Sequence, residues 1–140
     1  MSTGKIIVTR VEDTTPSDFP WGQIRWLFHG RLASDAEMTF AVVTLRAGQT
    51  APPHSHANCE ELMYALKGRF EVLASEETHL VSPGALIRIP RAVHHQSRNT
   101  SPEDAVLVCA YSAPVRETRV GQPPIPNTAS AGAPPTETAP

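Results

Sequence analysis

The sequence predicts an all-β fold, an antiparallel sandwich or barrel with little or no helix. Between Lys5 and Tyr111, short β-prone runs alternate with glycine, proline and serine. No apolar repeat with helical spacing is sustained over this region. The turns Ala47-Gly48, Lys67-Gly68 and Pro83-Gly84 each offer a residue that tolerates positive φ. Many short strands joined by tight turns are typical of such folds.

Three strands are predicted before residue 50. Lys5–Val11 contains a run of β-branched residues, and Ile24–Phe28 combines Ile24 with aromatic residues. Met38–Arg46 is rich in valine and threonine and ends at a glycine turn. Arg25 lies between the only two tryptophans. It could anchor a substrate carboxylate, but we expect this segment to add an edge strand or to pack at a dimer interface.

Six further strands are predicted after residue 60. Glu61–Leu66 and Arg69–Leu73 flank a Lys-Gly turn, as in a hairpin, and Thr78–Val81 and Leu86–Ile89 flank a Ser-Pro-Gly-Ala turn. The last two predicted strands are His95–Arg98 and Ala105–Tyr111. Each follows a turn that contains proline, and Ala105–Tyr111 is strongly apolar.

Length and composition indicate one domain with a C-terminal tail. A chain of 140 residues fits a single core. We assign residues 1–35 to N-terminal strands that could serve as a dimer arm, and residues 36–113 to the barrel. Seven of the 14 prolines fall in residues 114–140, which have no aromatic residue. This last segment is therefore expected to be a disordered tail.

The charge and the apolar pattern exclude several partner classes. The formal net charge is -2, so the chain has no basic field for nucleic acid or anionic lipid. No apolar run approaches the ~20 residues that cross a bilayer. The first ten residues lack the pattern of a signal peptide, so we expect a cytoplasmic protein. Two cysteines far apart in the chain form no disulfide framework.

A set of metal-binding side chains follows the third strand. In an extended segment His54 and His56 point to one face and can converge on one ion. Glu61 places a carboxylate at the start of the next strand, and His95 adds a third imidazole after a turn. Three imidazoles and a carboxylate make a mixed nitrogen and oxygen donor set.

The order and spacing of these residues resemble the two motifs of the cupin superfamily. Gly48, His54, His56, Glu61 and Gly68 match every position of the first motif. The second motif is matched by glycine, proline, histidine and asparagine, with alanine where glycine is usual; the residues are Gly84, Pro90, Ala92, His95 and Asn99. The resemblance covers residues 38–111. It implies a double-stranded β-helix, also called a jelly-roll barrel, similar to small single-domain quercetinase-like cupins.

The resemblance makes His54, His56, Glu61 and His95 the ligands of one divalent transition metal per chain. Iron or manganese is favoured, with nickel, zinc or copper as alternatives. A closed structural zinc site would more usually recruit thiolates, and the only nearby thiol, Cys59, is expected not to bind the metal. The donor set therefore favours an open site with room for substrate.

Several neighbouring residues are excluded from this site. His94 adjoins His95 on a strand and should face the other way, as Glu60 should beside Glu61. His29 and His79 match no ligand spacing. Asn99 has the character of a turn-capping residue rather than a catalyst.

Strand alternation predicts the wall of a substrate pocket. Met63 and Ala65 share the face of Glu61, and Ser97 shares the face of His95. Phe40 and Val42, with Thr44, share one parity of the strand before Gly48 and are expected to extend this wall, with plain core residues as the alternative.

These observations predict a metal-dependent enzyme that acts on a small organic molecule, and the resemblance to the cupins implies most directly an oxygen-dependent dioxygenase of quercetinase-like type. Glu61 would be both ligand and catalytic proton acceptor. The alternatives are a lyase or isomerase without redox chemistry and a binding protein without catalysis. Because a small barrel has edges to cover, we also expect a homodimer.

Overall fold

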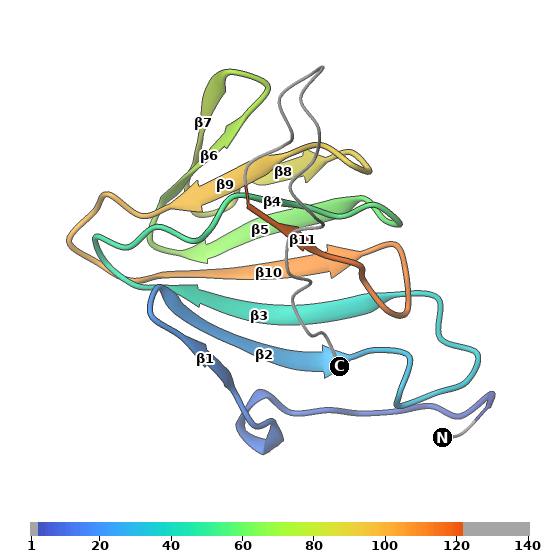
Figure 1. Cartoon of the computed structure of the whole chain (residues 1–140). Helices are drawn as coiled ribbons and strands as arrows, with labels where there is room; N and C mark the ends of the chain where they lie inside the picture. The colour runs from blue at the N-terminus through green and yellow to red at the C-terminus, as the bar shows by residue number, and fades with distance from the viewer. Residues whose placement is uncertain (1–2, 122–140) are drawn as a thin grey trace.

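Two antiparallel sheets packed face to face form the fold in a computed structural model, which describes residues 3–121 (Figure 1). The larger sheet has six strands in the order β1-β2-β3-β10-β5-β8, and the smaller has five in the order β11-β4-β9-β6-β7. Within the described residues the only helical turn is a three-residue 3-10 helix, η1 (Val11–Asp13). The predicted all-β jelly roll is confirmed.

The strands of the larger sheet are β1 (Ser17–Phe19), β2 (Gly22–Phe28), β3 (Thr39–Leu45), β5 (Glu61–Lys67), β8 (Leu86–Ile89) and β10 (Ala105–Tyr111). Those of the smaller sheet are β4 (His54–Ser55), β6 (Phe70–Ala74), β7 (Glu77–Val81), β9 (His95–Arg98) and β11 (Arg119–Val120). No helix in the described part of the chain has the length and apolar character needed to span a membrane.

The core lies between the two sheets and is built from alternate residues of the strands. On β10, every second residue from Ala105 to Tyr111 is buried, and β3 alternates in the same way from Thr39 to Leu45. Phe70 of β6 closes the core from the smaller sheet and is 1 % exposed. Truncating such a buried phenylalanine to alanine typically costs about 3–5 kcal/mol.

The hairpin between β5 and β6 depends on Gly68. Its φ is +67°, a value that side-chain-bearing residues rarely adopt. A β-carbon there would lie 2.4 Å from the carbonyl oxygen of Asp104. The turn therefore needs glycine both for its backbone conformation and for the close approach of the neighbouring loop.

The predicted strand Lys5–Val11 is wrong. Residues 5–10 have no regular secondary structure and lead into η1, and Ile6 and Val8 are exposed. A β-branched run favours extended backbone, but a strand also needs a neighbour to pair with. The edge position that this segment could have taken is instead filled by Ser17–Phe19, which pairs with β2.

The prediction of a disordered tail from residue 114 onward is wrong for its first part. Residues 114–121 lie along the smaller sheet, where β11 pairs with β4. Arg116 and Thr118 are buried, so this segment has inward-facing side chains that offset the entropy cost of ordering it. The remainder of the predicted tail, residues 122–140, lies outside the described residues.

Candidate metal centre

Strand pairing brings the four predicted metal ligands together. His54 begins β4, and His56 follows two residues later in the same extended segment. Glu61 begins β5 in the opposite sheet, and His95 begins β9, where it pairs directly with His54. One ligand atom from each of these four residues lies within 4.8 Å of all the others. The group could hold one metal ion.

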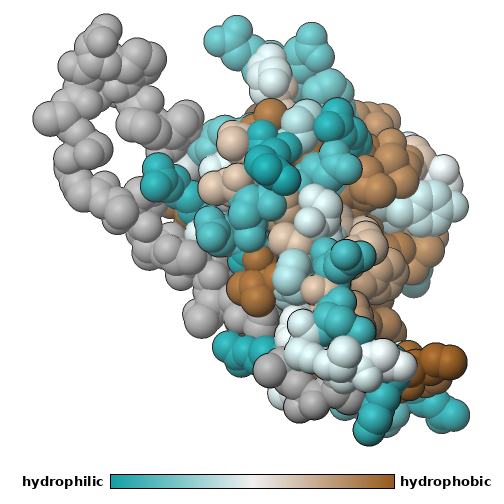
Figure 2. Space-filling model, turned by 90° about the vertical axis from the view of Figure 1, so that its right-hand side faces the viewer, coloured by the Kyte–Doolittle hydropathy of each residue, from teal (hydrophilic) through white to brown (hydrophobic). Residues whose placement is uncertain are grey.

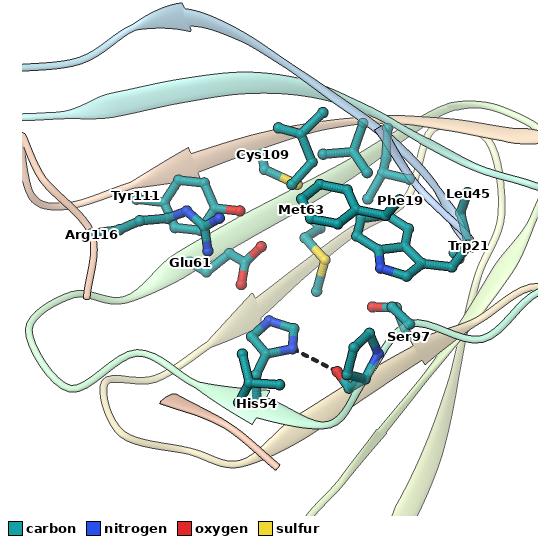
Figure 3. Close-up of a pocket in the computed structure, with 16 residues that line it drawn as sticks. Phe19, Trp21, Leu45, His54, Glu61, Met63, Ser97, Cys109, Tyr111 and Arg116 are labelled. Atoms are coloured by element: carbon teal, nitrogen blue, oxygen red, sulfur yellow. Dashed lines mark hydrogen bonds between the residues drawn. The ribbon is translucent and has the colours of Figure 1, made fainter. Parts of the chain in front are cut away.

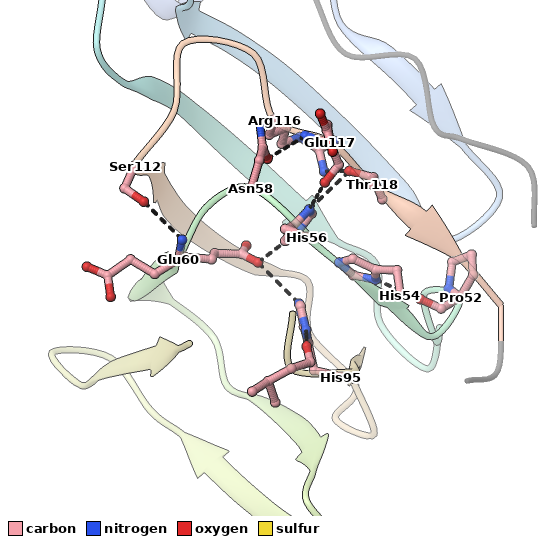
Figure 4. Close-up of polar contacts among 12 residues, drawn as sticks. Pro52, His54, His56, Asn58, Glu60, His95, Ser112, Arg116, Glu117 and Thr118 are labelled. Atoms are coloured by element: carbon pink, nitrogen blue, oxygen red, sulfur yellow. Dashed lines mark hydrogen bonds and ion pairs between the residues drawn. The ribbon is translucent and has the colours of Figure 1, made fainter. Parts of the chain in front are cut away.

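Each histidine of this group is oriented through its Nδ1 atom (Figure 4). His54 Nδ1 lies 3.0 Å from the carbonyl oxygen of Pro52, and His95 Nδ1 lies 2.9 Å from that of Val93. His56 Nδ1 lies 3.0 Å from the carbonyl oxygen of Glu117. A carbonyl oxygen only accepts hydrogen bonds, so each Nδ1 must carry the proton. The Nε2 atom of each neutral ring is then left with a lone pair.

These lone pairs meet the carboxylate of Glu61. Its Oε1 atom lies 3.1 Å from Nε2 of His56 and 3.2 Å from Nε2 of His95. Two lone pairs and an anionic oxygen at hydrogen-bond distance repel one another unless a cation lies among them. Protons on both rings would place two positive charges side by side, whereas one divalent metal satisfies all the donors. The chemistry of this donor set fits a metal.

The electrostatics of the group are coupled. Burial, with the neighbouring His95, lowers the pKa of His54 to about 3. Burial acts to raise the pKa of Glu61, but the His56 and His95 imidazoles beside its carboxylate hold it well below its usual value. Burial acts to lower the pKa of His95, but the Glu61 carboxylate beside it raises it overall. A neutral His54 and an ionised Glu61 are the forms that bind metals.

The neighbours excluded from this site lie elsewhere. Glu60 points outward and pairs with Arg88, with 2.9 Å between Oε2 and Nε. Within the described residues the ligand group does not include His29, His79 or His94. The ligand group is therefore formed without these neighbours.

Two other residues near the motifs have structural roles, as expected. Cys59 is buried beside the group without joining it, and burial raises the pKa of its thiol to about 11. Asn99 is buried, and its amide donates to the carbonyl oxygens of Leu45 and Glu103. It therefore holds the loop between β9 and β10, as a capping residue would.

A cavity of about 270 Å³ opens beside the ligand group (Figure 3). Glu61 and His54 lie at one end together with Tyr111 and Arg116. Most of the remaining lining is apolar, and at the other end Phe19 and Trp21 stack with ring centroids 5.0 Å apart. The cavity thus has a polar end at the candidate metal site and an aromatic end away from it.

The predicted pocket wall is correct in part. Met63 and Ser97 line the cavity. Ala65 faces inward and is fully buried, but it lies in the core and is not among the lining residues. The prediction is wrong for Phe40 and Val42, whose strand turns Val43 and Leu45 toward the cavity instead.

Sequence reasoning did not identify Tyr111 and Arg116 as members of this site. Tyr111 is the last residue of a predicted strand, and the sequence did not show which side chains of that strand point into the core. Arg116 fell in the predicted tail, yet its guanidinium lies 4.6 Å from the ring centroid of Trp26 and 5.0 Å from that of Tyr111. Three β-branched residues between positions 115 and 120 were a signal for extended backbone there; they are Val115, Thr118 and Val120.

The segment around the two tryptophans is mainly structural. Arg25 donates from Nη1 to the carbonyl oxygen of Thr14, 2.5 Å away, and does not line the cavity. This hydrogen bond connects the N-terminal segment to β2, as expected for a residue with a structural role. Trp21 is the exception, because it forms part of the cavity wall.

The fold and the ligand group agree with a comparison of the sequence with protein families. The Cupin domain family matches residues 41–111, about half of the chain. The chain belongs to the cupin family. A curated relative, Protein SchB of Streptomyces halstedii, is 30 % identical to this chain over 101 residues, which are 72 % of this chain and 73 % of that protein.

The second relative of this cupin is Polyketide synthase CurC of Streptomyces cyaneus, 27 % identical over 101 residues, 72 % of this chain and 66 % of that protein. Among solved structures, the oxalate decarboxylase formate complex of Lactobacillus farciminis superposes with a TM-score of 0.69 at 20 % identity. That match covers 76 % of this cupin but only 33 % of the decarboxylase chain, and at this identity it supports the fold alone.

Proposed function

We propose that this cupin is a metal-dependent enzyme that acts on a small, largely apolar organic molecule carrying hydroxyl or keto oxygens at one end. The observation that carries the proposal is the orientation of the three imidazoles. All three Nδ1 atoms face carbonyl oxygens, so three Nε2 lone pairs converge near Glu61 at the polar end of the cavity. His54, His56, Glu61 and His95 would hold the ion.

The shape and lining of the cavity support the substrate class. An engineered apolar cavity of ~150 Å³ holds benzene, so a cavity of about 270 Å³ accommodates one or two fused rings. The stacked Phe19 and Trp21 offer a flat apolar surface for such rings. CurC is named as a polyketide synthase protein, and we infer a polyketide-type substrate, because such compounds combine rings with hydroxyl and keto oxygens.

The reaction that we favour is an oxygen-dependent oxidation, as in a quercetinase-like dioxygenase, with iron or manganese. When bound, such an ion would polarise a substrate oxygen and supply the redox chemistry for dioxygen. Four protein ligands leave positions free in a five- or six-coordinate ion. Glu61 would hold the proton of a substrate hydroxyl, since its carboxylate lines the cavity. The apolar wall would exclude water from the reacting end.

A lyase or isomerase without redox chemistry is the second candidate. The observation that favours it is the proximity of two groups able to hold protons: Tyr111 is paired with Glu61 across β10 and β5, and both side chains line the polar end of the cavity. Proton transfer next to a polarised oxygen needs no oxidant.

Oxygen consumption separates the candidates. Anaerobically purified protein, loaded with iron or manganese, should consume oxygen with a phenolic or diketone compound of one or two rings. Turnover that persists without oxygen, and with zinc or nickel, would favour the second candidate. Tight binding of these compounds without turnover, under several metals and with oxygen present, would favour a binding protein and contradict the enzyme proposal.

A further inference from the structure

We propose that Tyr111 is a further catalytic residue, whose phenol hydroxyl donates a hydrogen bond to the substrate oxygen that enters the cavity beside Glu61. The inference rests on the proposed function, because it requires a substrate at this end of the cavity. Tyr111 ends β10 and is directly paired with Glu61, the first residue of β5. Paired residues of antiparallel strands point to the same face. Both side chains therefore project between the sheets.

The hydroxyl lies where a substrate oxygen would arrive. Tyr111 is 4 % exposed and lines the cavity, and Figure 3 shows its hydroxyl directed inward on the same side as the carboxylate of Glu61. The Glu61 carboxylate and the Cys109 thiol line the same cavity. A phenol both donates and accepts hydrogen bonds, whereas a thiol is a weak partner. A substrate hydroxyl or keto oxygen would complete the polar contacts at this end.

Three side chains surround the ring of Tyr111 and fix its direction. The Arg116 guanidinium lies 5.0 Å from the ring centroid, the His56 ring is edge-on at 5.3 Å, and the Trp26 ring is tilted at 6.4 Å. These contacts come from β2, from the segment after β4 and from the segment before β11. Because the donor is already oriented, it loses little conformational entropy when a ligand binds.

The apolar wall argues that the hydroxyl serves a ligand. On β10 the inward residues before Tyr111 are Ala105, Leu107 and Cys109, and the last two line the same cavity. Phenylalanine would continue that wall and make the same ring contacts. Burying a hydroxyl costs free energy unless hydrogen bonds compensate it. The hydroxyl therefore lowers the stability of the folded protein relative to phenylalanine at this position. A hydrogen bond to substrate would explain why tyrosine is present there.

A pair of tyrosine variants tests the proposal. The sequence has two tyrosines, and Tyr64 lies on β5 with 40 % exposure, so Tyr64→Phe is a matched control for Tyr111→Phe. The full chain would be loaded with zinc, and its metal content measured for each variant. Equilibrium dialysis then gives the affinity for 2,3-dihydroxynaphthalene, which has two oxygens, and for naphthalene, which has none.

We expect Tyr111→Phe to weaken binding of the diol about 3- to 10-fold, the effect of one lost hydrogen bond, and to leave naphthalene binding and metal content unchanged. Tyr64→Phe should bind both compounds as the wild type does. Equal affinity of Tyr111→Phe and wild type for the diol would overturn the role of Tyr111 and leave the proposed function standing. An equal loss of affinity for both compounds, or loss of zinc, would also overturn it. The hydroxyl would then only maintain the structure of the site and would not bind a substrate oxygen.

A measurement on the wild-type sequence keeps the test independent of how the variant folds. With 3-fluorotyrosine at both positions, the fluorine resonance of Tyr111 should shift when the diol binds to the zinc-loaded chain, and that of Tyr64 should not. Diol binding without a shift at Tyr111 would contradict the proposal. If the zinc-loaded wild type binds neither compound, the proposed substrate class fails, and this inference fails with it.

Discussion

His56 is held by a residue 61 positions further along the chain: its Nδ1 atom lies 3.0 Å from the carbonyl oxygen of Glu117. The neighbouring Thr118 places its hydroxyl 3.1 Å from the same nitrogen and accepts a hydrogen bond from Arg116 Nη1 at 2.7 Å (Figure 4). The segment before β11 thus connects a metal-ligand candidate to the cavity wall. The C-terminal part of the described chain is part of the site.

Thr118→Val should weaken metal binding, because it removes the hydroxyl next to Nδ1 of His56 while keeping the side-chain shape. Outer contacts of metal-binding histidines typically contribute 10–100-fold in affinity. Since the Glu117 carbonyl oxygen remains, we expect a loss of about 10-fold, measured by competition with a chelator. Thr100→Val, at an exposed position, is the control. An unchanged affinity for Thr118→Val would show that this segment does not support the site.

Ala92→Gly should stabilise the protein. Ala92 has a φ of +64°, in the region that costs a side-chain-bearing residue about 1–2 kcal/mol. Glycine removes this cost but loses about 0.5–1 kcal/mol of chain entropy. We expect a net gain of about 0.5–1 kcal/mol in the free energy of unfolding in urea. Ala110→Gly, inside β10, should instead lower it. A loss for Ala92→Gly would mean that the turn tolerates alanine without strain.

Both cysteines should resist modification in the folded protein. Cys59 and Cys109 are 1 % and 2 % exposed, and burial raises the pKa of both thiols, that of Cys59 to about 11. At pH 8, below these values, the reactive thiolate is scarce. Reaction with Ellman's reagent should need denaturant, whereas a Ser82→Cys thiol in the exposed turn should react at once. Fast labelling of the native wild type would contradict the burial of these thiols.

The outer face of the larger sheet is the surface on which we place the predicted homodimer. Tyr64, Leu66 and Leu86 are 40–56 % exposed on adjacent strands. In Figure 2 hydrophobic residues gather on the right, the side turned away from the viewer in Figure 1. Light scattering should give a dimer mass for the wild type and a monomer mass for Leu66→Glu. Leu80→Glu, on the smaller sheet, should stay dimeric. A monomeric wild type would refute the homodimer.

Strand positions could be predicted where turn chemistry bounds them. Ala105–Tyr111, His95–Arg98 and Leu86–Ile89 agree with the structure at both ends, and each of them follows a turn that contains proline. Lys5–Val11 failed because strand propensity says nothing about an available partner. The short strands β4 and β11 were missed because two residues carry too little pattern to separate them from a loop.

The metal ligands could be predicted, but much of the cavity could not. The spacing of two residues predicts that His54 and His56 point to the same face. The spacing of the cupin motifs predicts that Glu61 and His95 join them. The face of β3 could not be inferred in this way, because no ligand lies on that strand and the turn after Leu45 breaks the alternation. Tyr111 faces Glu61 only through the register of β10 against β5, which depends on pairing across the sheet.

The metal content of the purified protein shows whether the three imidazoles and Glu61 hold an ion. Elemental analysis of the anaerobically purified wild type should find about one divalent transition-metal ion per chain. His56→Ala should lose that ion, and His79→Ala, which changes a half-buried histidine outside the ligand group, should keep it. Unchanged metal stoichiometry in His56→Ala would show that these four residues are not the metal ligands.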